Sequence, residues 1–154
     1  MSTTKPLEGI KVIEISTIIT ASLSAMMLSD QGAEVIKIEQ TGFGDPLRYL
    51  GTQKGGISAI FANTNRGKRS VELDLKIESD LEQAKKLISE ADVLINNFRP
   101  GVMDSLGLGK EDCKTLNKDL IYVAITGFGK EGPYANAPAY DLSLIHISEP
   151  TRHA

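Results

Sequence analysis

The sequence predicts an α/β protein with a Rossmann-like, mainly parallel β-sheet flanked by helices. Three observations predict this class: short runs rich in valine and isoleucine recur, turn or helix-capping residues bound each run, and helical patterns separate them. The runs predict five strands, at residues 10–16, 34–39, 70–75, 92–96 and 120–126. Because strand and helix alternate, we expect right-handed βαβ crossovers.

The first helix is expected in the segment TASLSAMMLSDQG (20–32), between the first two strands. Its small and apolar residues are typical of a mostly buried helix. Gly32 is expected to end it, since glycine readily adopts the left-handed conformation that follows a helix. A weaker helical pattern, GKEDCKTLNKD (109–119), precedes the last strand.

A further helix is expected in ESDLEQAKKLISEA (78–91), between the third and fourth strands. Its apolar residues recur at helical spacing, at Leu81, Ala84, Leu87 and Ile88. Ser79 and Glu82 stand three residues apart, which is the spacing of a capping box. We therefore expect Ser79 to cap this helix.

The glycine-rich segment 40–68 interrupts the alternation and holds one short helix candidate, at 58–62. Loops of this length inside compact domains are usually functional or disordered. The aromatic and apolar residues of this segment favour a functional loop.

Charge and composition exclude several classes of protein. The net charge of the 154 residues is −3, and lysines and arginines are scattered, so neither nucleic acid nor an anionic membrane is an expected partner. No apolar run is long enough to span a membrane. Cys113 is the only cysteine and is expected on a helix face, and the start MSTTKPLEG has no signal-peptide pattern, so we expect a cytoplasmic protein.

GFGKEG (127–132) matches the dinucleotide fingerprint G-x-G-x-x-G. The fingerprint belongs at the first strand-to-helix turn, whereas this match follows the last predicted strand and is succeeded by Pro133. We interpret it as a chance match, although a non-catalytic nucleotide-binding module remains an alternative. The common phosphate-loop, metal and hydrolase motifs are absent from the sequence, and no metal is expected.

Two polar segments are candidate ligand contacts. NRGKRS (65–70) carries three cations, which are either a solvated strand entry or a phosphate clamp. NNFRPG (96–101) follows the fourth predicted strand, at the sheet edge where open α/β folds hold ligands. The residues by themselves thus predict an α/β domain with a ligand crevice.

Six segments resemble, in order, the landmarks of the class III CoA-transferases, the family of formyl-CoA transferase, carnitine CoA-transferase and α-methylacyl-CoA racemase. They are PLEGIKVIEIS, LSDQGAEVIKIE, GDPLR, NRGKRSVELDLK, ADVLINNFRPGVMDSLGL and LIYVAITGFGKEGPYANAPAYD, which together span 6–141. The resemblance implies a CoA-binding enzyme that transfers CoA from an acyl-CoA to a carboxylic acid through a covalent aspartyl intermediate. It also implies an interlocked homodimer.

The resemblance assigns contacts with coenzyme A or acyl-CoA, as substrate, to seven residues: Leu73, Lys76, Asn97, Phe98, Ala139, Tyr140 and Asp141. Cations and amides suit a diphosphate, and apolar side chains suit an adenine ring. The alternative interpretation is packing at a strand edge for Leu73 and Phe98 and simple exposure for Lys76.

The chain departs from the family pattern at several positions. Thr20, Ala21 and Ser22 replace an Ala-Gly-Pro sequence that many members carry, and Gln40 replaces an arginine that some members carry. Racemase members place a histidine where this chain has Tyr140, and a phenol is a poor base at neutral pH. An acyl-CoA racemase or isomerase is therefore the less favoured alternative.

The resemblance stops after Asp141 or Leu142, and the following LSLIHISEPTRH reads like a translated sequencing adapter. We expect residues 1–141 to be a truncated N-terminal Rossmann-like domain and residues 142–154 to be a non-native tail. The family's catalytic aspartate lies further along the chain than Asp141. The chain is thus expected to hold no catalytic residue and to be an inactive N-terminal fragment.

Overall fold

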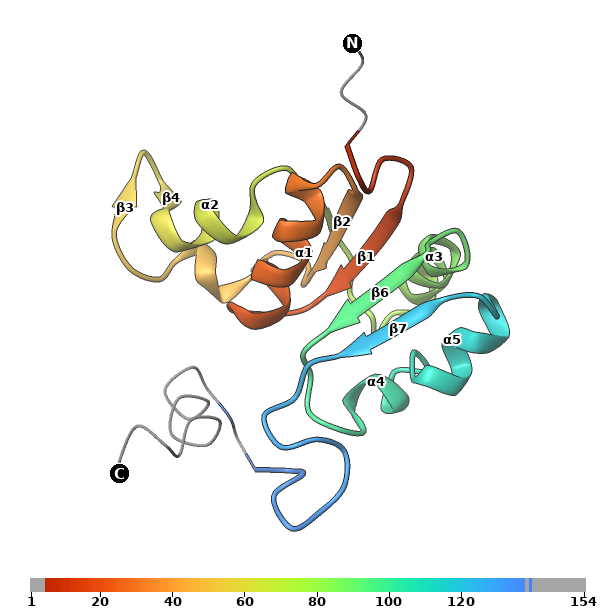
Figure 1. The fold of residues 1–154 in the computed structure, drawn as a ribbon. Helices are drawn as coiled ribbons and strands as arrows, with labels where there is room; N and C mark the ends of the chain where they lie inside the picture. The colour runs from red at the N-terminus through yellow and green to blue at the C-terminus, as the bar shows by residue number, and fades with distance from the viewer. Residues whose placement is uncertain (1–4, 138, 140–154) are drawn as a thin grey trace, which may run out of the picture.

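The computed structural model describes residues 5–137 and Ala139. Its main sheet has five strands, all parallel, in the order β5-β2-β1-β6-β7 (Figure 1). The strands are β1 (Lys11–Ile15), β2 (Glu34–Glu39), β5 (Arg69–Glu72), β6 (Val93–Asn96) and β7 (Ile121–Ala124). The predicted α/β class, the five strands and their parallel arrangement are confirmed.

The strand order reverses beside β1. From β1 the chain moves outward through β2 to β5 and then returns to place β6 on the other side of β1, so that Val12 is in register with both Val35 and Val93. In open α/β sheets, such a reversal opens a crevice at the carboxyl ends of the strands.

Two helical layers cover the sheet. The helices are α1 (Thr20–Asp30), α2 (Ala59–Asn65), α3 (Glu78–Ser89), α4 (Val102–Ser105) and α5 (Lys110–Leu116). Alternate residues of a strand face opposite sides of a sheet. Val12 accordingly packs with Ala21 and Ala25 of α1, whereas Ile13 packs with Ala84 and Ile88 of α3. Each layer has its own apolar core.

Of two predicted helix ends, the structure confirms one and contradicts the other. Helix α1 ends at Asp30, and Gly32 has a φ of 108°, so the predicted stop is confirmed. The capping box of α3 is wrong, because α3 begins at Glu78 and leaves Ser79 inside its first turn. Ile77 stands at the N-cap and provides no side-chain cap, while the carboxylate of Asp80 accepts a hydrogen bond from the backbone N–H of Asp74 (3.0 Å) in the turn before the helix.

The segment 40–68 is ordered into small elements beside α1 (Figure 1). They are a 3₁₀ turn, η1 (Pro46–Arg48), a hairpin of β3 (Gln53–Lys54) and β4 (Ile57–Ser58), and α2. Ser58 caps α2 through a hydrogen bond that its Oγ accepts from the N–H of Phe61 (3.3 Å). The short helix predicted at 58–62 is confirmed and extends to Asn65.

Cys113 lies in α5 and is fully buried, which confirms its prediction as a helix-face residue. Burial, with a smaller contribution from Asp112, raises the pKa of its thiol to about 11. Within residues 5–137, the helices are all too short or too polar to cross a membrane.

Candidate functional site

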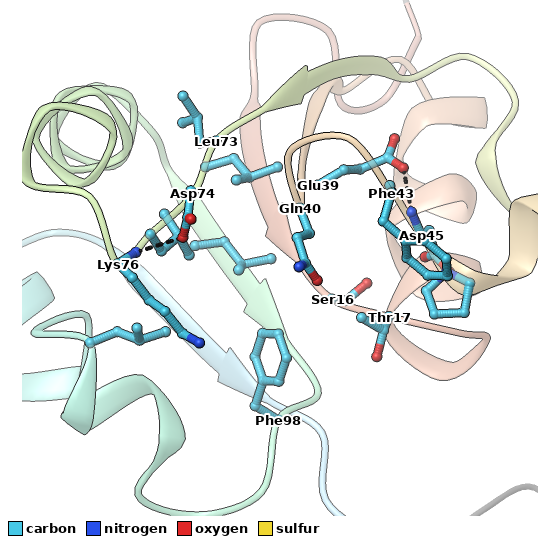
Figure 2. A pocket seen from close by; sticks show the side chains of 16 residues that line it. Ser16, Thr17, Glu39, Gln40, Phe43, Asp45, Leu73, Asp74, Lys76 and Phe98 are labelled. Carbon is cyan, nitrogen blue, oxygen red and sulfur yellow. Dashed lines mark hydrogen bonds between the residues drawn. The ribbon is translucent and has the colours of Figure 1, made fainter.

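A cavity of about 310 Å³ opens at the carboxyl ends of β1, β2 and β6 (Figure 2). Its apolar lining comes from both sides of β1: Ile15, Ile38, Phe43, Pro46, Leu73, Leu75, Phe98 and Leu106. Polar groups of Thr17, Gln40, Asp74 and Lys76 also line it. An apolar surface with a few polar groups is typical of a site for a small organic ligand.

Three of the residues assigned to CoA binding meet at this cavity. Leu73 is buried at the end of β5, Phe98 follows β6, and Lys76 is exposed in the turn before α3. Figure 2 shows the side chain of Lys76 extending across the opening toward the ring of Phe98. The backbone N–H of Lys76 donates to Asp74 Oδ1 (3.0 Å), which fixes the turn that carries it.

A second, smaller cavity of about 110 Å³ adjoins the first. Asn97 and Ala139 line it together with Thr20 at the start of α1, and Phe98 lines both cavities. Tyr140 and Asp141, the other two residues assigned to CoA, lie outside the described residues. The fold thus brings five of the seven candidates to one edge of the sheet.

The Asn97 side chain is bound to the turn that joins β1 to α1, residues 16–19. Its Oδ1 accepts from the backbone N–H of Thr17 (3.1 Å), and its Nδ2 donates to the backbone carbonyl of Thr17 (2.7 Å). The same Nδ2 also donates to Thr20 Oγ1 (3.2 Å). Both amide hydrogens of Asn97 are therefore engaged within the protein.

The same turn contains Ile18, whose φ of 67° is the only positive value of a non-glycine residue within 5–137. A β-branched residue in this left-handed conformation costs on the order of 1 to 3 kcal/mol. Asp45 Oδ1 accepts from the backbone N–H of Ile18 (3.2 Å) and from that of Leu47 (2.9 Å). Through these two hydrogen bonds, the buried Asp45 side chain links the turn to η1.

A buried ionic cluster lies beneath α1, next to the turn. Lys37 Nζ is 2.6 Å from Glu14 Oε1 and 2.9 Å from Asp45 Oδ2, and Lys68 Nζ is 2.7 Å from Glu14 Oε2. The hydroxyl of Ser22 donates to Glu14 (2.9 Å) and accepts from Lys37 (3.0 Å). Burial raises the pKa of the Glu14 carboxyl, but the two lysines outweigh it and hold that pKa below its usual value.

This cluster corrects the interpretation of NRGKRS. Its three cations diverge: Arg66 pairs with Asp30 (2.5 Å), Lys68 with Glu14, and Arg69 with Glu34. Lys68 is neither solvated nor free to clamp a phosphate, because its ammonium is buried against Glu14. The physical reason is that the residues leading into β5 pack against α1: Lys68 Nζ also donates to the backbone carbonyl of Ser22 (2.8 Å), and the backbone carbonyl of Gly67 accepts from Ser29 Oγ (3.0 Å).

Glu39, at the end of β2, is held by a second set of contacts. Arg48 donates to both of its carboxylate oxygens (2.6 and 2.8 Å), and Ser70 Oγ donates to Oε1 (2.6 Å). Burial raises the pKa of Glu39, but these hydrogen bonds outweigh it and lower that pKa to about 2. In dinucleotide-binding folds, an acidic residue about here binds a ribose hydroxyl, whereas Glu39 is already occupied by Arg48.

The GFGKEG segment follows β7 and is succeeded, as far as Ala137, by bends and turns rather than a helix. The first strand-to-helix turn, STIIT, contains no glycine. Both facts fit a chance match to the dinucleotide fingerprint. Among the residues that the structure describes, no group of three or more His, Cys, Asp or Glu side chains is arranged to hold a metal ion.

The described elements form a doubly wound α/β domain with a cavity at its topological switch point. The family model for CoA-transferase family III matches residues 7–149, and the chain belongs to this family. The resemblance found in the sequence is thereby confirmed.

Two curated relatives illustrate the match. The chain is 43% identical over 143 residues to acetyl-CoA:oxalate CoA-transferase of Acetobacter aceti, covering 93% of this chain and 37% of the relative. It is 35% identical over 157 residues to human succinyl-CoA:glutarate CoA-transferase, covering 97% of this chain and 36% of the relative. The chain therefore spans little more than a third of the length of these relatives.

Solved structures share the fold. A CAIB/BAIF family protein from Brucella suis superposes with a TM-score of 0.89 at 39% identity, covering 96% of this chain and 40% of that chain. Rv3272 from M. tuberculosis superposes with a TM-score of 0.89 at 36% identity, covering 98% of this chain and 42% of that chain.

Proposed function

We propose that this chain is the CoA-binding N-terminal part of an acyl-CoA:carboxylic acid CoA-transferase. The observation that carries the proposal is the convergence of Leu73, Lys76 and Phe98 on one cavity in a member of CoA-transferase family III. The apolar lining suits the adenine or pantetheine part of CoA, and the Lys76 ammonium suits a phosphate. Acyl-CoA and a carboxylic acid are the proposed substrates.

The transfer reaction needs a carboxylate nucleophile that forms a covalent acyl intermediate. The resemblance places that aspartate beyond Asp141, so no described residue receives a catalytic role in this proposal. The described residues bind CoA and hold it at the carboxyl edge of the sheet. An interlocked homodimer and a cytoplasmic location complete the proposal, and the buried free thiol of Cys113 fits a reducing compartment.

Specific observations favour this function over its alternatives. A dinucleotide-binding module is disfavoured because Glu39 is paired with Arg48 and the first turn lacks glycine. A racemase is disfavoured because Tyr140 stands where racemase members carry a histidine.

Calorimetric titration with CoA and with NAD tests the binding step. We expect CoA to bind and NAD not to bind. Lys76→Gln should weaken CoA binding several-fold and reduce its salt dependence, because a phosphate loses its cation. Lys118→Gln is the matched control, since Lys118 is exposed in the turn before β7, outside the lining of the first cavity. NAD binding without CoA binding contradicts the proposal.

The reaction itself is tested on the full-length gene product. We expect CoA to move from an acyl-CoA to an added carboxylic acid. Deuterium exchange at the α-carbon of a branched acyl-CoA, in the absence of an acceptor acid, would instead favour the racemase.

A further inference from the structure

We infer that Asp45 and Asn97 form a two-sided clamp on the β1–α1 turn and act as positioning residues for the CoA site. The inference rests on the proposed function and assigns new roles to these two side chains. Each hydrogen-bonds to the backbone of a different residue of the turn: Asn97 to Thr17, and Asp45 to Ile18.

The turn needs such a clamp because of its backbone conformation. Ile18 has a φ of 67°, which disfavours an isoleucine, and the neighbouring Ile19 offers no side-chain cap to α1. Local preferences therefore oppose this conformation, and contacts from elsewhere in the fold must maintain it. Asp45 comes from the segment after β2 and Asn97 from the end of β6, so tertiary contacts supply both sides of the clamp.

The turn forms part of the walls of both cavities. Ser16 and Thr17 line the larger cavity, and Thr20, one residue past the turn, lines the smaller one. A turn that left this conformation would reshape the two cavities together. A ligand as long as CoA that occupies both would then bind only to the fraction of molecules with the clamped turn.

The two clamp residues are themselves held in place. Asp45 is 1% exposed, its backbone N–H donates to Glu39 Oε2 (2.8 Å), and its Oδ2 is 2.9 Å from Lys37 Nζ. This Oδ2 accepts no hydrogen bond of good geometry from the described residues, so Oδ1 carries the contacts to the turn and to η1. The ionic cluster beneath α1 thus holds the Asp45 side chain in place through Lys37.

The primary test is Asn97→Ala, with two measurements: CoA affinity by calorimetry and amide hydrogen exchange by NMR. We expect CoA to bind about tenfold more weakly, which corresponds to a clamped fraction of about one tenth. We expect exchange to accelerate at the amides of Thr17 and Ile18 in particular. Asp45→Asn should accelerate exchange at Ile18 and Leu47, whose N–H groups donate to Asp45 Oδ1, and also across the domain, because it removes one carboxylate from the buried ionic cluster.

The matched control is Asn117→Ala. Asn117 Nδ2 donates to the backbone carbonyl of Ala91 (2.8 Å), so this variant loses a similar amide bond at the amino end of the sheet, away from both cavities. We expect CoA affinity to stay within twofold of the wild-type value. Equal weakening by the two variants would overturn the clamp in favour of general destabilisation.

A rescue variant separates positioning from direct contact with CoA. Glycine adopts the left-handed conformation of Ile18 without strain. Ile18→Gly in the Asn97→Ala background should therefore recover at least threefold of the lost affinity. Affinity lost through a missing ligand contact would not return, and that result would overturn the positioning role.

Hydrogen exchange tests the clamp independently of CoA binding, so the two hypotheses can fail separately. If the wild-type chain binds no CoA, the proposed function fails for this chain. In that case, accelerated exchange confined to Thr17 and Ile18 in Asn97→Ala still supports the clamp, and unchanged exchange overturns it.

Discussion

Glu14 and Lys37 are in register on neighbouring strands, and their charged groups meet 2.6 Å apart with the side chains 0% and 1% exposed. The pair lies between the sheet and α1 and is completed by Lys68 and Asp45. Two lysines and two carboxylates balance, so the cluster buries no net charge. Removing any one member leaves an uncompensated buried charge.

Lys37→Met is therefore expected to lower the free energy of unfolding by about 3 to 5 kcal/mol. Urea denaturation followed by circular dichroism measures this change. Glu34→Gln is the control, since Glu34 and its partner Arg69 are 48% and 66% exposed and such pairs contribute at most about 1 kcal/mol. A Lys37→Met chain as stable as the Glu34→Gln chain would contradict the cluster.

The pH dependence of stability should carry a contribution from Glu39. Its pKa is lowered from 4.5 to about 2, so its stabilising contribution is fully present above about pH 4.5 and is lost as the pH falls toward 2. Glu39→Gln removes this contribution at every pH. The stability difference between wild type and variant should thus be largest above pH 5, at about 2 to 3 kcal/mol, and should shrink on acidification. A difference that is constant between pH 6 and pH 3 would show that Glu39 does not titrate in this way.

Gln40→Arg should tighten CoA binding. Gln40 lines the larger cavity, where Lys76 is the only cationic residue among the described residues of the lining. A second cation favours a phosphate-bearing ligand, and we expect about a threefold to tenfold lower Kd at low ionic strength, with less gain at high salt. Gln53→Arg places the same charge on the exposed β3 strand, outside this lining. If both variants improve binding equally, the effect comes from net charge and not from the cavity.

Cys113 should be unreactive in the folded chain. At pH 8 a thiol with a pKa of about 11 is almost entirely protonated, and its side chain is buried in α5. Ellman's reagent should therefore label the native chain far more slowly than the chain unfolded in urea, which serves as the control. Rapid labelling under native conditions would show that α5 opens readily.

The strands and main helices could be predicted from the sequence because their signals are local. The valine and isoleucine runs around Val12, Val35 and Leu94 are apolar enough to mark buried parallel strands without knowledge of their neighbours. Gly32 likewise marked the end of α1 through its own backbone freedom. The candidate site was reached differently, through six segments in the order of a known family.

The sequence did not reveal the roles of the buried charges. Glu14, Lys37 and Lys68 look like ordinary polar residues of strands and strand entries, and 23 positions separate the first two. One signal was available: Glu14 and Lys37 occupy equivalent places in two runs that the predicted sheet could pair. The sequence patterns contain no comparable signal for Asp45.

By itself, then, the sequence determined the α/β class, the five strands, the turn chemistry at Gly32 and the family. The tertiary structure alone decided that Ile18 adopts a left-handed backbone between Asp45 and Asn97 and that Lys68 neutralises Glu14. The physical reason is the sequence separation of the interacting residues. Secondary structure follows from periodicity and backbone preference within a few residues. The contacts of the strained turn and the Lys68–Glu14 pair instead join residues 27 to 80 positions apart, which meet only when the sheet has formed.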